Sequence, residues 1–148
     1  MIEFTLPSLL EVAKDAAIKA GSALIEQQNI ARQVHHSPER DVKIIGDTIS
    51  ETIIIEYLQL HSSFPILSEE AGIIGKIDRE QYLWIVDPLD GSLNYSHGIP
   101  FFCISIALWK GNEPILGVIF DFNRNELFSG IIGEGSWLNE TAIKTSKI

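Results

Sequence analysis

The chain has 148 residues, of which 45% are hydrophobic and 21% are charged, and its formal net charge is −9. This length and composition are typical of one globular domain that can bury a core. The excess of acidic residues argues against nucleic acid and anionic membranes as partners, because phosphate groups are bound mainly through lysine and arginine. No apolar run approaches the roughly 20 residues that a membrane span requires.

The N-terminal residues and the cysteine content indicate the cellular compartment. The opening MIEFTLPSLL has no basic region before an apolar block, so it does not read as a secretory signal. The single cysteine, Cys103, excludes a disulfide within the chain and is compatible with a reducing environment. We therefore expect a cytoplasmic protein.

Two helices are predicted in the first part of the chain. Apolar residues recur at helical spacing over residues 6–28, where Ser8 and Glu11 suggest a capping box. A polar loop is expected over residues 33–41, followed by a second helix over about residues 50–60. The side of the second helix that we expect to be buried consists of Ile53, Ile54, Tyr57 and Leu58.

Strands are predicted in the remainder of the chain. Residues 64–67 and 82–86 are short apolar runs, and from residue 101 onward β-rich runs alternate with the turns KGNE, NRN and GEG. This alternation is typical of an antiparallel meander. The last residues, TAIKTSKI, resemble the start of a further strand. The expected fold class is therefore α+β, with two N-terminal helices packed on one face of a mostly antiparallel sheet.

The segment DPLDGS places two carboxylates directly after the buried run that ends at Val86. A buried strand does not normally end in two acids unless a positive charge is nearby. The proline fixes one backbone torsion between Asp87 and Asp90, and the glycine permits a tight turn. Such a turn would direct both carboxylates and the Leu89 carbonyl to one side. Hard oxygen ligands of this kind suit Mg²⁺.

The residues after the second aspartate suggest an anion site. Ser92 can cap a helix that starts at Leu93, which would place the N–H groups of Gly91 and Ser92 at a helix N-terminus. The alternative interpretation is that Asp87 caps a turn while Asp90 lies in solvent, and a lone D-x-x-D pattern favours that alternative.

A second acidic pair, Glu69 and Glu70, follows the other short strand in the sequence ILSEEAG. Adjacent glutamates usually form a solvated turn. If the two strands are neighbours, however, Glu69 and the two aspartates meet at one edge of the sheet. Three convergent carboxylates cannot all stay ionised without cations, so a metal ion would resolve the repulsion.

Together these segments resemble the inositol monophosphatase family of Mg²⁺-dependent, lithium-sensitive phosphomonoesterases. The family signature D-P-[IL]-D-G-[TS]-x-N-[FY] is matched in order within WIVDPLDGSLNY. The flanking segments ILSEEAG, HGIPFFCISIAL and GEGSWLN are further family features. The resemblance covers essentially the whole chain.

The resemblance implies a role for each matching residue. Ser92 stands where the family usually has threonine, whose hydroxyl helps to orient the attacking water, and Asp47 is the match to the acid that partners this hydroxyl. The implied catalytic residues are Asp47, Glu70 and Ser92. The implied phosphate-binding residues are Lys43, Gly91 and Ser92. The implied metal ligands are the side chains of Glu69, Asp87 and Asp90 and the carbonyl of Leu89.

The activity that the resemblance implies is in-line attack by a metal-activated water on a small anionic phosphate ester. Inositol monophosphate or a similar ester is the expected substrate. Activity as a 3′(2′),5′-bisphosphate nucleotidase or as a fructose-1,6-bisphosphatase stays open as an alternative.

Chain length bears on the domain organisation. Family chains run roughly 100 residues longer than the size typical of one domain, and their second half supplies a further ligand aspartate. We therefore expect residues 1–148 to form a single domain that resembles the N-terminal domain of these enzymes, with the C-terminal domain absent. The competing hypothesis is a catalytically incomplete module that binds metal or phosphate, or that forms a homodimer through an exposed β edge at residues 143–148.

Overall fold

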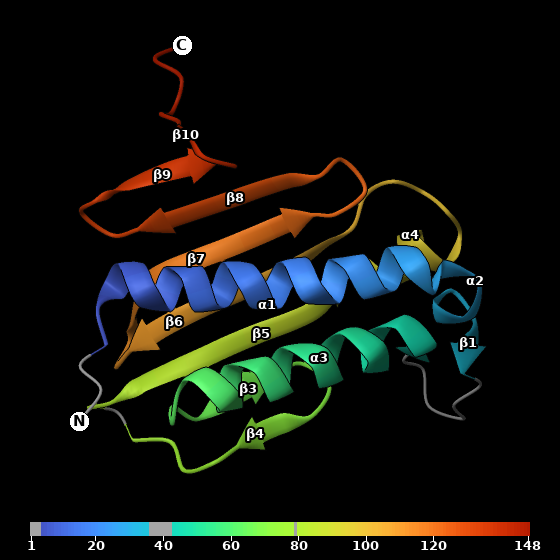
Figure 1. Cartoon of the computed structure of the whole chain (residues 1–148), viewed down its shortest axis with the longest axis horizontal. Helices are drawn as coiled ribbons and strands as arrows, with labels where there is room; N and C mark the ends of the chain where they lie inside the picture. Colours follow the sequence, from blue (N-terminus) through green and yellow to red (C-terminus); the bar gives the residue numbers. More distant parts are fainter. Residues whose placement is uncertain (1–3, 36–42, 79) are drawn as a thin grey trace.

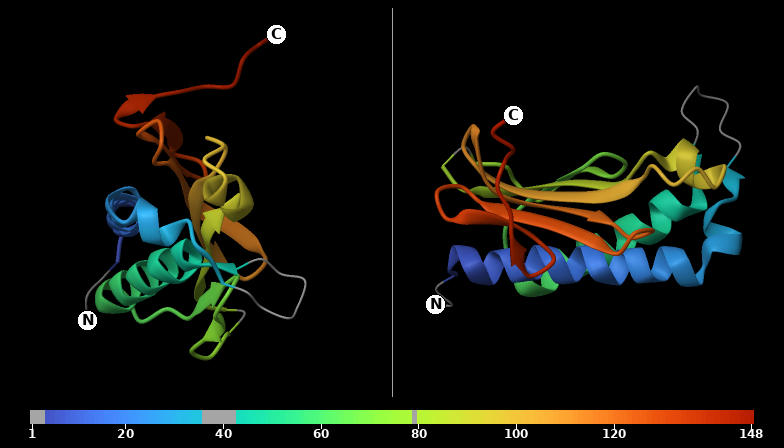
Figure 2. Two further views of the ribbon diagram at one scale, coloured as in Figure 1. Left: turned by 90° about the vertical axis from the view of Figure 1, so that its right-hand side faces the viewer. Right: turned by 90° about the horizontal axis from the view of Figure 1, so that it is seen from above.

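The computed structural model describes residues 4–35, 43–78 and 80–148. Its two long helices are α1 (Leu6–Glu26) and α3 (Ile45–His61), and they lie side by side on one face of the main sheet (Figures 1 and 2). Two short helices, α2 (Gln28–Ala31) and α4 (Ser92–Ser96), lie near one end of the molecule. The predicted pair of N-terminal helices on a sheet is therefore confirmed.

Helix α1 begins at a different cap from the one predicted. Thr5 is the N-cap, its Oγ1 accepts the Ser8 N–H at 3.2 Å, and the Ser8 Oγ accepts the Thr5 N–H at 3.1 Å. The capping box is therefore Thr5 with Ser8, and Glu11 instead forms an ion pair with Lys14 at 2.9 Å. Pro7 fits within the first turn because that turn leaves backbone N–H groups without helical partners.

Helix α3 begins at Ile45, about five residues before the predicted start. Asp47 in its first turn accepts the Ile44 N–H at 2.9 Å, which caps the helix at a point where the sequence has no Ser or Thr N-cap. The predicted buried side is confirmed for Ile54 and Leu58, while Ile53 and Tyr57 are partly buried against the same core.

The main sheet has eight strands in the order β10-β9-β8-β7-β6-β5-β3-β4. Strands β3 and β5 pair in parallel and all other neighbours are antiparallel, so the predicted meander is confirmed. Val34–His35 (β1) and Lys43–Ile44 (β2) form a separate antiparallel pair. The strands of the main sheet are β3 (Ile66–Ser68), β4 (Gly72–Ile74), β5 (Tyr82–Asp90), β6 (Cys103–Lys110), β7 (Glu113–Asp121), β8 (Glu126–Ile131), β9 (Gly135–Leu138) and β10 (Thr141–Ala142).

Two predictions about strands and loops are corrected. Residues 143–148 form no strand, and the edge of the sheet is instead the two-residue strand β10. Strand β1 lies within the segment that was predicted to be a polar loop, and residues 36–42 of that segment lie outside the described residues.

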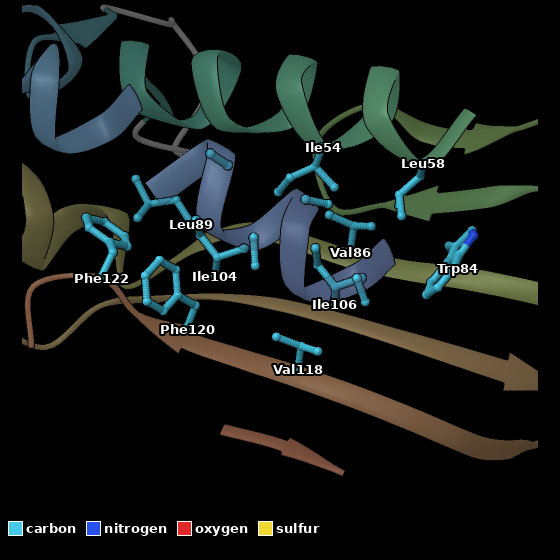
Figure 3. Close-up of a cluster of buried hydrophobic side chains, with 14 of the residues drawn as sticks. Ile54, Leu58, Trp84, Val86, Leu89, Ile104, Ile106, Val118, Phe120 and Phe122 are labelled. Atoms are coloured by element: carbon cyan, nitrogen blue, oxygen red, sulfur yellow. The ribbon is translucent and has the colours of Figure 1, made fainter. Parts of the chain in front are cut away.

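The hydrophobic core lies between the sheet and the two long helices (Figure 3). Ile54 and Leu58 of α3 pack toward side chains of the central strands, among them Trp84 of β5 and Ile106 of β6. The Trp84 Nε1–H donates to the Ser62 Oγ at 2.9 Å, so the one polar atom of this buried ring is satisfied. Alternate residues of β5, β6 and β7 are buried, which places the intervening residues on the opposite face.

The opposite face of the sheet is not covered by any helix longer than α4 among the described residues (Figure 2). It carries large apolar side chains that are exposed, with Ile119 at 49%, Phe128 at 37% and Ile132 at 69%. A cavity of about 510 Å³ is lined by strands β6 to β9 on this part of the sheet. None of the described helices is both long and apolar enough to cross a membrane.

Candidate active site at the end of strand β5

The two aspartates lie at the C-terminal end of β5, where the strand contains a bulge. Asp87 is paired with Ser105 and Asp90 is paired with Cys103, so three steps along β5 match two steps along β6. Residues three apart in a regular strand point to opposite faces of the sheet. The extra residue in the bulge reverses this, because Ser105 and Cys103 share a face. Both aspartates are therefore directed to the face away from the two long helices.

Glu69 is placed beside Asp87 by the parallel pairing of β3 with β5. Ser68 is paired with Val86, and the Glu69 N–H donates to the Val86 carbonyl at 3.1 Å. The expectation that Glu69 and the aspartates meet at one place depended on these two strands being neighbours, and they are neighbours. The Glu69 and Asp87 carboxyl groups lie close enough to share a hydrogen bond when one of them is protonated.

Electrostatics at this position oppose ionisation of Asp87. Burial raises the pKa of Asp87 from 3.8 to about 7, and the hydrogen bond and charge of Glu69 and the charge of Asp90 act in the same direction. The Leu89 N–H, which donates to the Asp87 Oδ1 at 3.2 Å, acts in the opposite direction. The protein therefore holds these carboxylates together at an electrostatic cost.

The donor set fits a hard cation. Within the described ranges, no group of three or more His, Cys, Asp or Glu side chains is already arranged as a metal site. The raised pKa of Asp87 nevertheless shows that the charges of Glu69 and Asp90 act at this carboxylate. A bound divalent cation would remove that repulsion, and carboxylate oxygens are the ligands that Mg²⁺ prefers.

Gly91 makes the turn from β5 into α4. Its φ of 83° lies in the left-handed region, and a Cβ at this position would be 2.6 Å from the Phe101 carbonyl oxygen. The same carbonyl accepts the Asn94 Nδ2–H at 2.9 Å, which ties α4 to the start of β6. Helix α4 begins at Ser92, one residue before the predicted start, with Gly91 as the N-cap. The signature thus becomes a tight backbone turn that only glycine fits.

The other predicted site residues lie on neighbouring elements. Asp47 is 5% exposed in the first turn of α3, and its pairing with the half-buried Ser92 stays a prediction. Glu70 lies in the turn between β3 and β4. Lys43 belongs to β2, but its side chain lies outside the described part of the structure, so its role in binding phosphate stays a prediction.

Three further residues contact the site segments and were not predicted from the sequence as site residues. The Ser50 Oγ donates to the Pro88 carbonyl at 2.6 Å, and the Glu51 carboxylate contacts the turn that carries Glu69. A signal for both exists, because they follow Asp47 at helical spacings of three and four residues.

Cys103, which we expected to be a core residue, is instead half-buried beside the site, with its Sγ 3.9 Å from the Asp90 Oδ2. Burial, together with the nearby charges of Asp90, Asp87 and Asp121, raises the pKa of the Cys103 thiol to about 11. The thiol therefore stays protonated at neutral pH, which confirms the expectation that it is not a reactive thiolate.

Comparison with protein families assigns this arrangement. The profile of the inositol monophosphatase family matches residues 6–148. The chain belongs to the inositol monophosphatase family. Inositol monophosphatase 1 of Solanum lycopersicum is 37% identical over 145 residues, which cover 96% of this chain and 53% of that protein. The chain thus spans about half the length of the curated relatives that it matches.

A solved structure and a second relative extend the comparison. The structure of inositol monophosphatase from Anabaena (Nostoc) sp. PCC 7120 matches with a TM-score of 0.81 and 38% identity, over 97% of this chain and 51% of that chain. The fructose-1,6-bisphosphatase of Pyrococcus furiosus is 39% identical over 111 residues, which cover 75% of this chain and 42% of that protein. The α+β fold predicted from the sequence is thus shared with this family, whose named members are phosphatases.

Proposed function

We propose that this member of the inositol monophosphatase family is a Mg²⁺-dependent phosphomonoesterase that hydrolyses inositol monophosphate or a similar small phosphate ester. The observation that carries the proposal is the convergence of Glu69 and Asp87 at the end of two paired strands, with Asp90 close enough to raise the pKa of Asp87. Carboxylates held together against their own repulsion are typical of a cation site.

The roles of the residues follow from their places. Glu69, Asp87 and Asp90, with the Leu89 carbonyl, would hold Mg²⁺, which when bound supplies an activated water and neutralises charge on the phosphate and on the leaving oxygen. The backbone N–H groups at the Gly91–Ser92 turn would hold the phosphate oxygens.

The remaining residues would act on the nucleophile and the substrate. The Ser92 hydroxyl, with Asp47 as its partner, would orient the attacking water. Glu70 would act near the same water, and Lys43 would add positive charge toward the phosphate. Fixing the water and the ester in line accounts for a large part of such catalysis, because the groups are oriented before reaction.

The substrate within this class is an open part of the proposal. One relative is named an inositol monophosphatase and another a fructose-1,6-bisphosphatase, and both match the segment that carries the carboxylates. We favour inositol monophosphate because the Asn94–Tyr95 pair after the signature resembles the inositol phosphatase branch. A 3′(2′),5′-bisphosphate nucleotidase activity is the other alternative.

We expect Mg²⁺-dependent release of phosphate from inositol 1-phosphate, with inhibition by lithium. Fructose 1,6-bisphosphate and 3′-phosphoadenosine 5′-phosphate, assayed in parallel, rank the substrates. Asp90→Asn should lower kcat/KM by about 100-fold or more, because loss of a partner outside the metal's own ligands already costs 10–100-fold. Glu113→Gln, an exposed charge change at the start of β7, serves as the control. Unchanged release by Asp90→Asn would sink the assignment of this residue.

A second candidate function is a catalytically incomplete module that binds metal or phosphate and forms a homodimer. The observation that favours it is the uncovered apolar face of the sheet, with Ile119, Phe128 and Ile132 exposed. Exposed apolar patches of this kind mark interaction surfaces. The relatives are about twice as long as this chain, so a lone copy leaves exposed a face that a second copy would cover.

Size-exclusion chromatography across concentration tests the dimer. The second candidate predicts a concentration-dependent dimer that Ile119→Lys shifts toward monomer, because a charge would have to be buried in the interface. Leu60→Lys is the matched control, since Leu60 is 78% exposed on α3, away from this face. A strict monomer with Mg²⁺-dependent turnover would count against this candidate.

A further inference from the structure

One turn of helix α3 contacts both segments that carry the candidate metal ligands. Ser50 and Glu51 are consecutive residues of this helix, and their side chains reach β5 and the turn after β3, respectively. We propose that Glu51, together with Ser50, is a positioning residue that fixes the separation of Glu69 and Asp87 and thereby the affinity for Mg²⁺. This inference rests on the proposed function, since it concerns the same site.

Glu51 holds the turn on both sides of the acidic pair. Its Oε1 accepts the Ser68 hydroxyl at 2.5 Å and the Ala71 N–H at 2.8 Å. Ser68 precedes Glu69 and Ala71 follows Glu70, so one carboxylate oxygen fixes both ends of this four-residue turn. Hydrogen bonds to an ionised acceptor are shorter and stronger than neutral ones, which suits a group that must hold a turn in place.

Ser50 holds the other segment. Its side chain is fully buried, and its Oγ donates to the Pro88 carbonyl at 2.6 Å, within the bulge between Asp87 and Asp90. A bulge interrupts the ladder of backbone hydrogen bonds, so a side-chain donor from outside the sheet can fix its conformation. The helix therefore restrains the bulge and the Glu69 turn from one side.

Such restraint matters because the carboxylates of Glu69 and Asp87 repel each other when both are ionised. The backbone bond from the Glu69 N–H to the Val86 carbonyl fixes only the start of the turn. Without Glu51, the turn could relax and carry the Glu69 carboxylate away from Asp87. Partners that orient metal ligands in this way typically change metal affinity by 10–100-fold when removed.

Isothermal titration of the chain with Mg²⁺ tests the proposal through three variants. Glu51→Ala should weaken binding by about tenfold or more, whereas Glu51→Gln should stay within about threefold because its amide oxygen can still accept both hydrogen bonds. Glu56→Ala, on the exposed side of the same helix, controls for the lost negative charge and should leave the affinity unchanged. Equal weakening by Glu51→Gln and Glu51→Ala would overturn the proposal in favour of a long-range charge effect, and unchanged binding by Glu51→Ala would overturn it outright.

Amide hydrogen exchange of the metal-free chain separates this proposal from the proposed function. Glu51→Ala should speed exchange at Ala71 and Glu69, while amides in the middle of β6 keep the protection of the unmutated chain. Glu51→Gln should retain slow exchange at both positions. If the unmutated chain binds no Mg²⁺, the proposed function fails, and the exchange experiment still decides whether Glu51 fixes the turn. Unaltered exchange in Glu51→Ala would show that it does not.

Discussion

Asp87→Asn is expected to stabilise the metal-free chain above pH 7 and to abolish Mg²⁺ binding. In the folded chain the pKa of Asp87 is raised to about 7, mainly by burial and by Glu69. Ionising this group therefore favours the unfolded chain. We expect a gain of about 1–2 kcal/mol in the free energy of unfolding for the asparagine variant, after allowing for solvent screening of this half-buried group.

The pH dependence gives the sign of this effect. Below about pH 4 Asp87 is protonated in both states and the two proteins should have similar stability. Between about pH 4 and pH 7 the unfolded chain loses its proton first, so the free energy of unfolding of the unmutated chain should fall as pH rises. Urea unfolding at pH 4, 5.5 and 8 measures this, with Glu113→Gln as the control variant. A stability difference that does not change with pH would contradict the assignment.

Mg²⁺ should reverse the order of stability. A ligand that binds only the folded chain raises the free energy of unfolding according to its concentration relative to Kd. The unmutated chain should therefore gain stability from Mg²⁺ at pH 8, while Asp87→Asn should gain little. Its binding should also strengthen as pH rises toward 7, because the proton on Asp87 competes with the cation.

Gly91→Ala is expected to destabilise the fold by about 2–4 kcal/mol, since two separate costs add. An alanine at a φ of 83° adopts the disfavoured left-handed conformation, and its Cβ would lie 2.6 Å from the Phe101 carbonyl oxygen. The backbone carbonyl belongs to the start of β6 and cannot move aside as a flexible side chain could. Thermal or urea unfolding measures the loss.

Gly133→Ala is the matched control for this prediction. Gly133 has a φ of 81°, but a Cβ there would meet nothing within 4 Å, so its substitution carries the conformational cost alone, about 1–2 kcal/mol. The difference between the two variants measures the close approach of Phe101 to Gly91. Equal losses in the two variants would show that this contact does not constrain the turn.

The parts of the fold that follow local patterns could be predicted from the sequence. The periodicity of α1, the β-rich runs from residue 101 onward and the glycine turn of the signature each reflect interactions between residues close in the chain. The start of α3 was predicted too late because its cap comes from Asp47 within the first turn, whereas a Ser or Thr N-cap was the signal sought.

The site required information that lies in the pairing of distant segments. That Glu69 meets Asp87 depends on the parallel pairing of β3 with β5, and that Asp87 and Asp90 share a face depends on the bulge opposite β6. Neither register can be read from the spacing of the acids alone. The contacts of Ser50 and Glu51 were missed for the same reason, since their partners are 38, 17 and 20 residues away in the chain.

A Mg²⁺ titration of the isotope-labelled chain, followed by NMR, tests the central claim that the end of β5 is a cation site. The proposal predicts saturable binding, with the largest chemical-shift changes at residues 69–71 and 87–92. Asp90→Asn should remove these changes. Shifts that do not saturate, or that centre on the acidic residues at 121–126 instead, would contradict the account.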